Sequence, residues 1–94
     1  MRVRTSPEAE EDIREVFDYI ARDSLQSANL VAGRIIDAID DLAFLEGRGR
    51  KGVVGGTLER VVPRTGCVLI YRIEPDEVLI LRVWRSARGA PRLT

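Results

Sequence analysis

The residues best suited to binding chemistry lie near the end of the chain, around its single tryptophan. Trp84, Arg85 and Arg88 follow an apolar, strand-forming run that contains Arg82, and no acidic residue separates them. A guanidinium binds carboxylate or phosphate through paired hydrogen bonds, and an aromatic side chain beside arginines is typical of an interface hot spot. We therefore predict that these four residues bind a partner. The alternative is a solvated strand end, in which the tryptophan packs half-buried against a helix.

Few residues of the chain could support hydrolysis or metal binding. It has no histidine and one cysteine, Cys67, so zinc ligands and a catalytic triad lack their usual side chains. The glycine-rich stretch 47–56 contains no Gly-Lys-Ser/Thr, and a phosphate loop also needs a strand before it and a helix after it. We therefore expect a flexible loop there, and we expect no catalytic residue, metal site or cofactor.

Cysteine content and hydropathy predict the surroundings of the protein. A single cysteine excludes an internal disulfide and fits a reducing cytoplasm. No leading apolar run resembles a signal peptide, and no stretch approaches the roughly 20 apolar residues of a membrane span. We therefore expect a cytoplasmic protein with no membrane partner.

The formal net charge of zero hides two halves of opposite sign. Residues 1–46 carry 5 basic and 11 acidic side chains, whereas residues 47–94 carry 10 basic and 4 acidic ones. Fourteen of the fifteen basic residues are arginine, which suits contacts with carboxylate or phosphate but can equally reflect genomic base composition. This polarity favours a macromolecular partner over a small-molecule pocket.

Two amphipathic helices are predicted in the acidic half. Ser6 and Pro7 form an N-cap followed by proline at the first helical position, and apolar residues at three- and four-residue spacing predict a helix over 7–22. Ser24 is expected to cap a second helix over 25–46, and the short connection makes the pair an antiparallel hairpin. Three apolar residues lie off the main stripe of the second helix and indicate a partner site: Leu30, Ile36 and Phe44.

The basic half is predicted to consist of strands. Apolar runs bounded by turn residues predict strands over 57–62, 67–74 and 78–85, and a short alternating strand over 2–5 opens the chain. With 94 residues there is room for a single domain and a single core. The order strand, helix, helix, strand, strand, strand predicts a two-layer α+β fold, with the helical hairpin packed on a mostly antiparallel sheet. The other face of the sheet then stays open to solvent or a partner.

Six short segments, taken in order, resemble a known family. They are Val-Arg-Thr-Ser-Pro-Glu-Ala-Glu-Glu-Asp-Ile over 3–13, Asp18-Tyr-Ile-Ala21, Arg34-Ile-Ile-Asp-Ala-Ile39 with Leu42, Gly56-Thr-Leu-Glu59, Leu69-Ile-Tyr-Arg72 and Trp84-Arg-Ser-Ala-Arg88. Together they resemble the RelE/ParE superfamily of toxins from bacterial type II toxin–antitoxin pairs. The resemblance spans nearly the whole chain and implies a RelE-like fold with one toxin domain over 1–94.

Two branches of this superfamily differ at a few positions. By the resemblance, the ribonuclease branch has lysines aligning with Glu59 and Val61, arginines aligning with Val68 and Arg88, and a tyrosine after that last arginine. Of this set only Arg88 is present. Cleavage of mRNA needs cationic stabilisation of the phosphate and general acid–base help, and Glu59 and Val61 cannot supply the cations. Glu59 is expected instead to pair with a neighbouring arginine such as Arg72.

What remains is similar to the ParE branch, whose members poison DNA gyrase. The resemblance implies a protein-binding inhibitor rather than a nuclease, held in a heteromeric complex by a cognate antitoxin and without specific DNA binding of its own. The antitoxin is expected near Leu30, Ile36 and Phe44, with Arg60 and Arg72 receiving its acidic side chains. Two alternatives stay open, a ribosome-dependent mRNA endonuclease and a non-toxic member that only binds the antitoxin.

Overall fold

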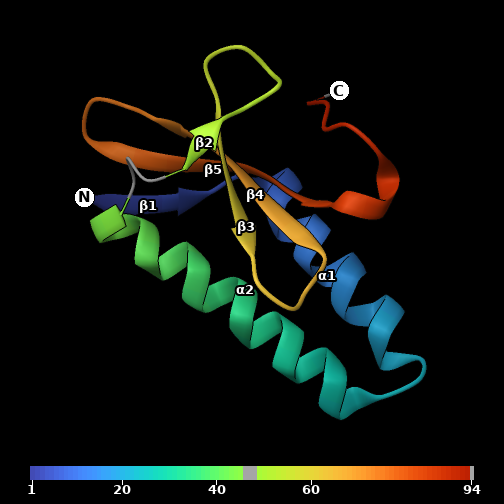
Figure 1. Cartoon of the computed structure of the whole chain (residues 1–94). Coiled ribbons are helices and arrows are strands. Elements are labelled where there is room, and N and C mark those ends of the chain that lie inside the picture. The colour runs from blue at the N-terminus through green and yellow to red at the C-terminus, as the bar shows by residue number, and fades with distance from the viewer. Residues whose placement is uncertain (46–48, 94) are drawn as a thin grey trace.

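The protein folds into a helical hairpin packed against a five-stranded sheet (Figure 1). The structure, a computed structural model, describes residues 1–45 and 49–93. Its elements are β1 (Arg2–Thr5), α1 (Pro7–Ala21), α2 (Leu25–Leu45), β2 (Arg50–Lys51), β3 (Leu58–Val62), β4 (Cys67–Ile73), β5 (Glu77–Arg85) and the 3₁₀ turn η2 (Ser86–Arg88). The strand order is β1-β5-β4-β3-β2, with β1 parallel to β5 and the other pairs antiparallel. The predicted two-layer α+β fold is confirmed.

The predicted helices and strands all occur, with ends that differ by at most one residue. The predicted end of the second helix at residue 46 lies outside the described residues. One strand was not predicted: β2 lies in the stretch expected to be a flexible loop and pairs with β3 through Arg50 and Glu59. A strand of two residues has no alternation to detect, so only its pairing partner reveals it.

Both helices begin where the sequence predicts. The Ser6 hydroxyl accepts a hydrogen bond from the Ala9 backbone N–H at 3.0 Å and donates one to the Leu81 carbonyl at 2.9 Å. This serine therefore caps α1 and also ties its first turn to β5. At the start of α2, the Ser24 hydroxyl accepts from the Ser27 N–H at 3.1 Å.

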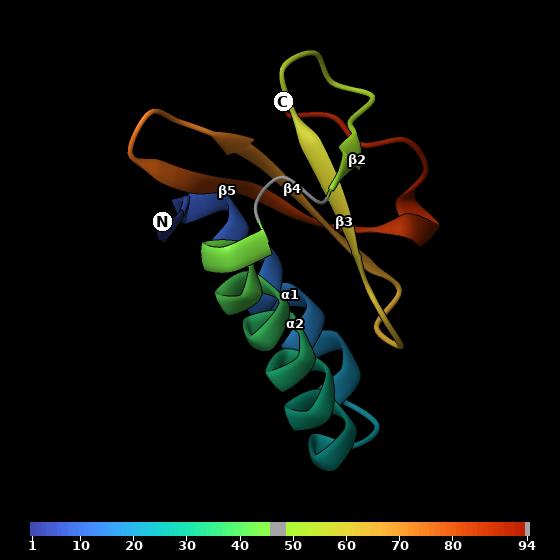
Figure 2. The ribbon, with the colours of Figure 1, turned by 60° about the vertical axis from the view of Figure 1, so that its left-hand side comes forward.

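The hydrophobic core lies between the helices and one face of the sheet, and Figure 2 shows both helices on that side. Ile35 and Leu42 of α2 pack here with Leu69 and Ile80 of the sheet, and all four are fully buried. Tyr71 is also fully buried, and its hydroxyl accepts a hydrogen bond from the Gly49 N–H at 3.0 Å.

The opposite side of the sheet, which we call the open face, is covered by neither helix. Strand register places its residues in three cross-strand rows: Arg4–Leu79–Arg72, Arg82–Ile70–Glu59–Arg50 and Trp84–Val68–Val61. The apolar residues of these rows other than Val61 are nevertheless buried, with Ile70 at 0% and Trp84 at 2% exposure. The segment after β5 returns over this face, because the Trp84 indole N–H donates to the Gly89 carbonyl at 3.0 Å.

A bulge in β5 decides which arginines share a face. Ile70 pairs with Arg82 whereas Tyr71 pairs with Ile80, so Leu81 is left without a partner on β4. Because the bulge precedes Arg82, the three-residue step from Arg82 to Arg85 still crosses the sheet. Arg82 lies on the open face and Arg85 on the helix side.

Candidate functional site: a cleft between α1 and β5

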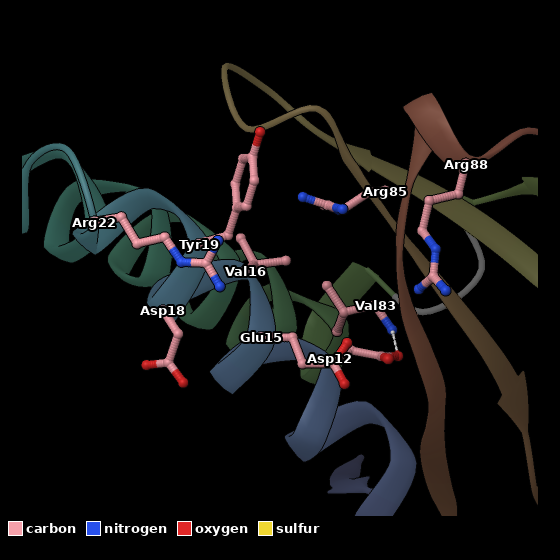
Figure 3. A pocket seen from close by; sticks show the side chains of 9 residues that line it. All are labelled: Asp12, Glu15, Val16, Asp18, Tyr19, Arg22, Val83, Arg85 and Arg88. Carbon is pink, nitrogen blue, oxygen red and sulfur yellow. Dashed lines mark hydrogen bonds between the residues drawn. The ribbon is translucent and has the colours of Figure 1, made fainter.

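A cleft opens where the middle of α1 meets the end of β5 (Figure 3). We call it the α1–β5 cleft, and it is lined by Asp12, Glu15, Val16, Asp18, Tyr19, Arg22, Val83, Arg85 and Arg88. Its wall on α1 carries three carboxylates, and its opposite wall carries two arginines. The acidic and basic halves of the sequence therefore face each other across this cleft.

Tyr19 is the exposed aromatic residue of the cleft. Its ring is stacked by the guanidinium of Arg85 at 4.9 Å and lies 6.0 Å from that of Arg22. Figure 3 shows Arg85 pointing across the cleft toward this ring. Tyr19 is 58% exposed, so a partner entering the cleft can contact the ring as well as the cations.

Asp12 fixes the floor of the cleft. Its carboxylate accepts two hydrogen bonds from Arg82, at 2.7 and 2.8 Å, and a third from the Val83 backbone N–H at 2.9 Å. Strand β1 pairs with β5 only as far as Ile80, so the outer edge of β5 is unpaired beyond that point. Asp12 supplies the missing acceptor there, and the acid–arginine contacts raise the pKa of Arg82.

Trp84 lies on the other side of β5, under a group of arginines. The guanidinium carbons of Arg82, Arg88 and Arg92 lie 5.3, 5.1 and 5.5 Å from its ring centroid. Together with the Gly89 contact, these side chains hold the segment after β5 against the open face. Trp84 therefore organises this segment and is not itself accessible.

Within residues 1–45 and 49–93, no group of three or more His, Cys, Asp or Glu side chains is placed to hold a metal ion. Cys67 is buried, and this burial raises the pKa of its thiol. Over the same described part of the chain, no helix is both long and apolar enough to cross a membrane.

Comparison with known proteins decides the family. Residues 3–89 match the model of the ParE toxin of type II toxin-antitoxin system, parDE. The chain belongs to this family. It is 33% identical over 92 residues to Y4kP of Sinorhizobium fredii, a protein named as a candidate toxin, covering 98% of this chain and 95% of that protein. A chain of the chromosomal ParDE system from P. aeruginosa superposes with a TM-score of 0.83 over 90% of this chain and 95% of that one, at 22% identity, and so shares the fold.

The resemblance stated from the sequence is thereby confirmed. The protein is a ParE-type toxin of a type II toxin–antitoxin system, and membership of that family implies an antitoxin as partner. The roles of individual residues are a separate question, which depends on where the fold places them.

The structure separates the four residues predicted to bind the target. Arg85 and Arg88 both line the α1–β5 cleft of this ParE-type toxin. Arg82 is held by Asp12, and Trp84 is buried on the open face instead of half-buried against a helix. The sequence did not single out Tyr19, although it lies off the apolar stripe of α1, because an exposed tyrosine on a helix has no distinguishing pattern.

The residues predicted to bind the antitoxin fall on different surfaces. Leu30, Ile36 and Phe44 are exposed along α2, at 53%, 50% and 85%. Arg60 lies on the helix side of β3, 3.8 Å from Asp41 of α2, whereas Arg72 lies on the open face beside Glu74. A single partner segment would have to wrap around the sheet to reach both arginines.

Glu59 pairs with a neighbouring arginine as predicted, but this arginine is Arg50 and not Arg72. Glu59 is 4% exposed and accepts from Arg50 at 3.2 Å and from the Val53 backbone N–H at 3.1 Å. Arg50 is the cross-strand neighbour of Glu59 because β2 pairs with β3. The sequence did not predict β2, so this partner could not be predicted either. A carboxylate paired in this way is structural.

Proposed function

We propose that this ParE-type toxin inhibits DNA gyrase, using Arg85 and Arg88 at the α1–β5 cleft, and that a cognate antitoxin neutralises it in the cytoplasm. The observation that carries the target site is the state of these two arginines. Among the described residues no carboxylate lies within ion-pair distance of either side chain, whereas Arg82, only a few residues away, is fully engaged by Asp12. Arg85 and Arg88 stack on aromatic rings but have no internal carboxylate in the described part of the chain, so their hydrogen-bond donors are available to a target.

The geometry also supports binding over RNA cleavage. The positions that the ribonuclease branch fills with cations hold here a buried carboxylate, Glu59, an exposed apolar residue, Val61, and a buried apolar residue, Val68. Glu59 is tied to Arg50 and to a backbone N–H, so it is not free to exchange a proton with a substrate. General acid–base catalysis requires a group that can approach the reacting atoms.

The target site is tested by replacing both cleft arginines. We expect the double variant Arg85→Ala/Arg88→Ala to lose growth inhibition and gyrase supercoiling inhibition by at least tenfold, while its fold and its affinity for the antitoxin change little. Arg14→Ala is the matched control, because Arg14 is exposed on α1 and, among the described residues, forms an ion pair with Glu11 alone.

Soluble protein levels are matched in both assays. Full inhibition by the double variant would move the target site away from the cleft, most simply onto the acidic helical hairpin. Codon-dependent cleavage of mRNA in a purified translation system would replace gyrase by the ribosome as the target.

For neutralisation, we propose that an antitoxin segment orders on the toxin as an amphipathic helix along α2. Leu30, Ile36 and Phe44 expose apolar side chains that the toxin's own core does not use. A segment that is disordered alone can bury such residues while an extended continuation reaches the sheet, where Arg60 and Arg72 can receive its acidic side chains.

The α2 surface is tested by Phe44→Asp. We expect this change to weaken the toxin–antitoxin complex by about 2 kcal/mol or more, because it places a charge at an apolar anchor. Leu25→Asp is the control, since Leu25 is a similarly exposed apolar residue of α2 outside the predicted set. Unchanged affinity in a folded Phe44 variant would remove this residue from the interface.

A further inference from the structure

The open face of the sheet carries an array of arginines, all but one of which lie outside the α1–β5 cleft. We call it the arginine face and define it by Arg2, Arg4, Arg50, Arg72, Arg88 and Arg92. The first four project from β1, β2 and β4 on this side of the sheet, and the last two reach it from the segment after β5 by stacking over Trp84. Only Arg88 also borders the α1–β5 cleft.

Two carboxylates on this side of the sheet, Glu59 and Glu77, lie beneath the arginines, whereas Glu74, which pairs with Arg72, is 31% exposed. Glu77 has a side-chain exposure of 9% and is held by Arg2 and Arg4, whose own side chains are 73% and 56% exposed. Glu59 is 5% exposed beneath Arg50, which is 61% exposed. A molecule approaching this face therefore meets guanidinium groups first, and the acids serve to hold them in place.

The floor of this face offers little to a protein partner. Leu79, Ile70, Val68 and Trp84 are all at most 8% exposed, and Val61, at 53%, is the one exposed apolar residue of the three rows. The face therefore lacks the cluster of apolar anchors that dominates protein–protein interfaces. The phosphate backbone of a nucleic acid needs no such anchor, because its recognition rests on arginine and lysine contacts. Single strands are bound by stacking their bases on accessible aromatic rings, and the one aromatic residue in the three rows of this face, Trp84, is buried.

We infer that the arginine face binds the phosphate backbone of a nucleic-acid duplex, independently of its sequence. The inference goes beyond gyrase inhibition and does not require it, because the contact is made by the toxin alone. A toxin with this property would already be bound to nucleic acid when it meets its target.

The experiment measures binding of the full-length toxin to a fluorescent mixed-sequence DNA duplex by anisotropy at several salt concentrations. We expect binding at about 50 mM salt that weakens steeply as salt rises, because counterions are released from the phosphates. Arg72→Glu/Arg92→Glu should lower the affinity at least tenfold and make the plot of log affinity against log salt shallower by about two, one for each lost contact.

The matched control is Arg14→Glu. Arg14 and Arg72 are both exposed and both pair with a glutamate close in sequence, but Arg14 lies on α1. The control should change duplex affinity less than about twofold. Circular dichroism verifies that all variants are folded.

Several results would overturn the inference: no duplex binding at low salt, an equal loss in the control, tighter binding of a single strand than of the duplex, or displacement by polyglutamate as effective as by unlabelled duplex. The last would identify an acidic protein as the natural partner. A second duplex of RNA distinguishes the source of the phosphates, and preference for either duplex supports the arginine face. Gyrase is absent from this assay, so a lack of duplex binding would not contradict the proposed inhibition of gyrase. Equally, a lack of gyrase inhibition would not contradict duplex binding.

Discussion

On the helix-covered face of the sheet, Leu69 and Ile80 are buried by the apolar side chains of α1 and α2. On the open face, Glu59 and Glu77 are buried to a similar degree beneath arginines, and Ile70 lies among them. The first face is closed by hydrophobic packing, which involves no titrating group and is not screened by salt. The second is closed by long amphipathic side chains that cover the floor with their stems and keep their charges in water.

The two faces of this small sheet therefore have different roles: the helix-covered face stabilises the fold, and the open face presents charged groups to partners. The centre of the helix-covered face is apolar. The arginines available to partners lie on the open face, at the end of β5 and, for Arg60, at the margin of the helix side. Asp12 lies at the boundary between the two faces, which we call the seam, because its side chain reaches from α1 to the outer edge of β5. Three substitutions test this division, one on each side and one at the seam.

The largest effect is expected from the helix-covered face. Leu42→Ala should destabilise the protein by about 3 kcal/mol, because a fully buried leucine is replaced by a cavity. Leu30→Ala on the same helix is the control, and since Leu30 is half-exposed it should change stability by less than about 0.5 kcal/mol. Denaturant unfolding measures both. Equal small losses would mean that the core is not where we place it.

A smaller effect is expected at the seam. Asp12→Asn keeps the shape of the side chain but leaves Arg82, which is 17% exposed, without its opposite charge, and should cost about 2 kcal/mol. Glu11→Gln removes the neighbouring exposed ion pair with Arg14 and should cost less than about 0.5 kcal/mol. If the two variants unfold at the same denaturant concentration, Asp12 does not anchor β5.

The smallest effect, and the one that depends on pH, is expected on the open face. The hydrogen bond from Arg4, together with the positive charges of Arg4 and Arg2, lowers the pKa of Glu77 below its ordinary value of 4.5. In the unfolded chain the carboxylate titrates near 4.5, so the stability that it contributes is complete above that pH and is lost as the pH falls through the lower, folded-state pKa.

The measurement is the difference in unfolding free energy between the wild type and Glu77→Gln over a pH series. This difference should be constant above pH 4.5 and shrink below it. A difference that stays the same down to about pH 3 would show that Arg4 and Arg2 do not stabilise the charged form of Glu77.

Much of the architecture is predictable from local patterns. The Ser6-Pro7 start of α1, the apolar spacing of both helices and the turn residues between strands each act over a few neighbouring positions, and the observed ends agree within one residue. The candidate site is predictable only in part. Arg85, which is half-buried, and Arg88, which is exposed, were predicted from the sequence as basic residues of the site. Tyr19 joins them only because α1 packs beside the end of β5.

The sequence by itself determined the helical hairpin, the strands, the opposite charges of the two halves and the family. Only the tertiary structure decided which charges are free. Arg82 is neutralised by a carboxylate 70 residues away, and Trp84 is turned to the open face by strand pairing. A bulge at Leu81 and the two-residue strand β2 set these partners, and both arise from cross-strand register. Register is set by the pairing of segments that are distant in the sequence, so it cannot be predicted from the residues of any one short segment.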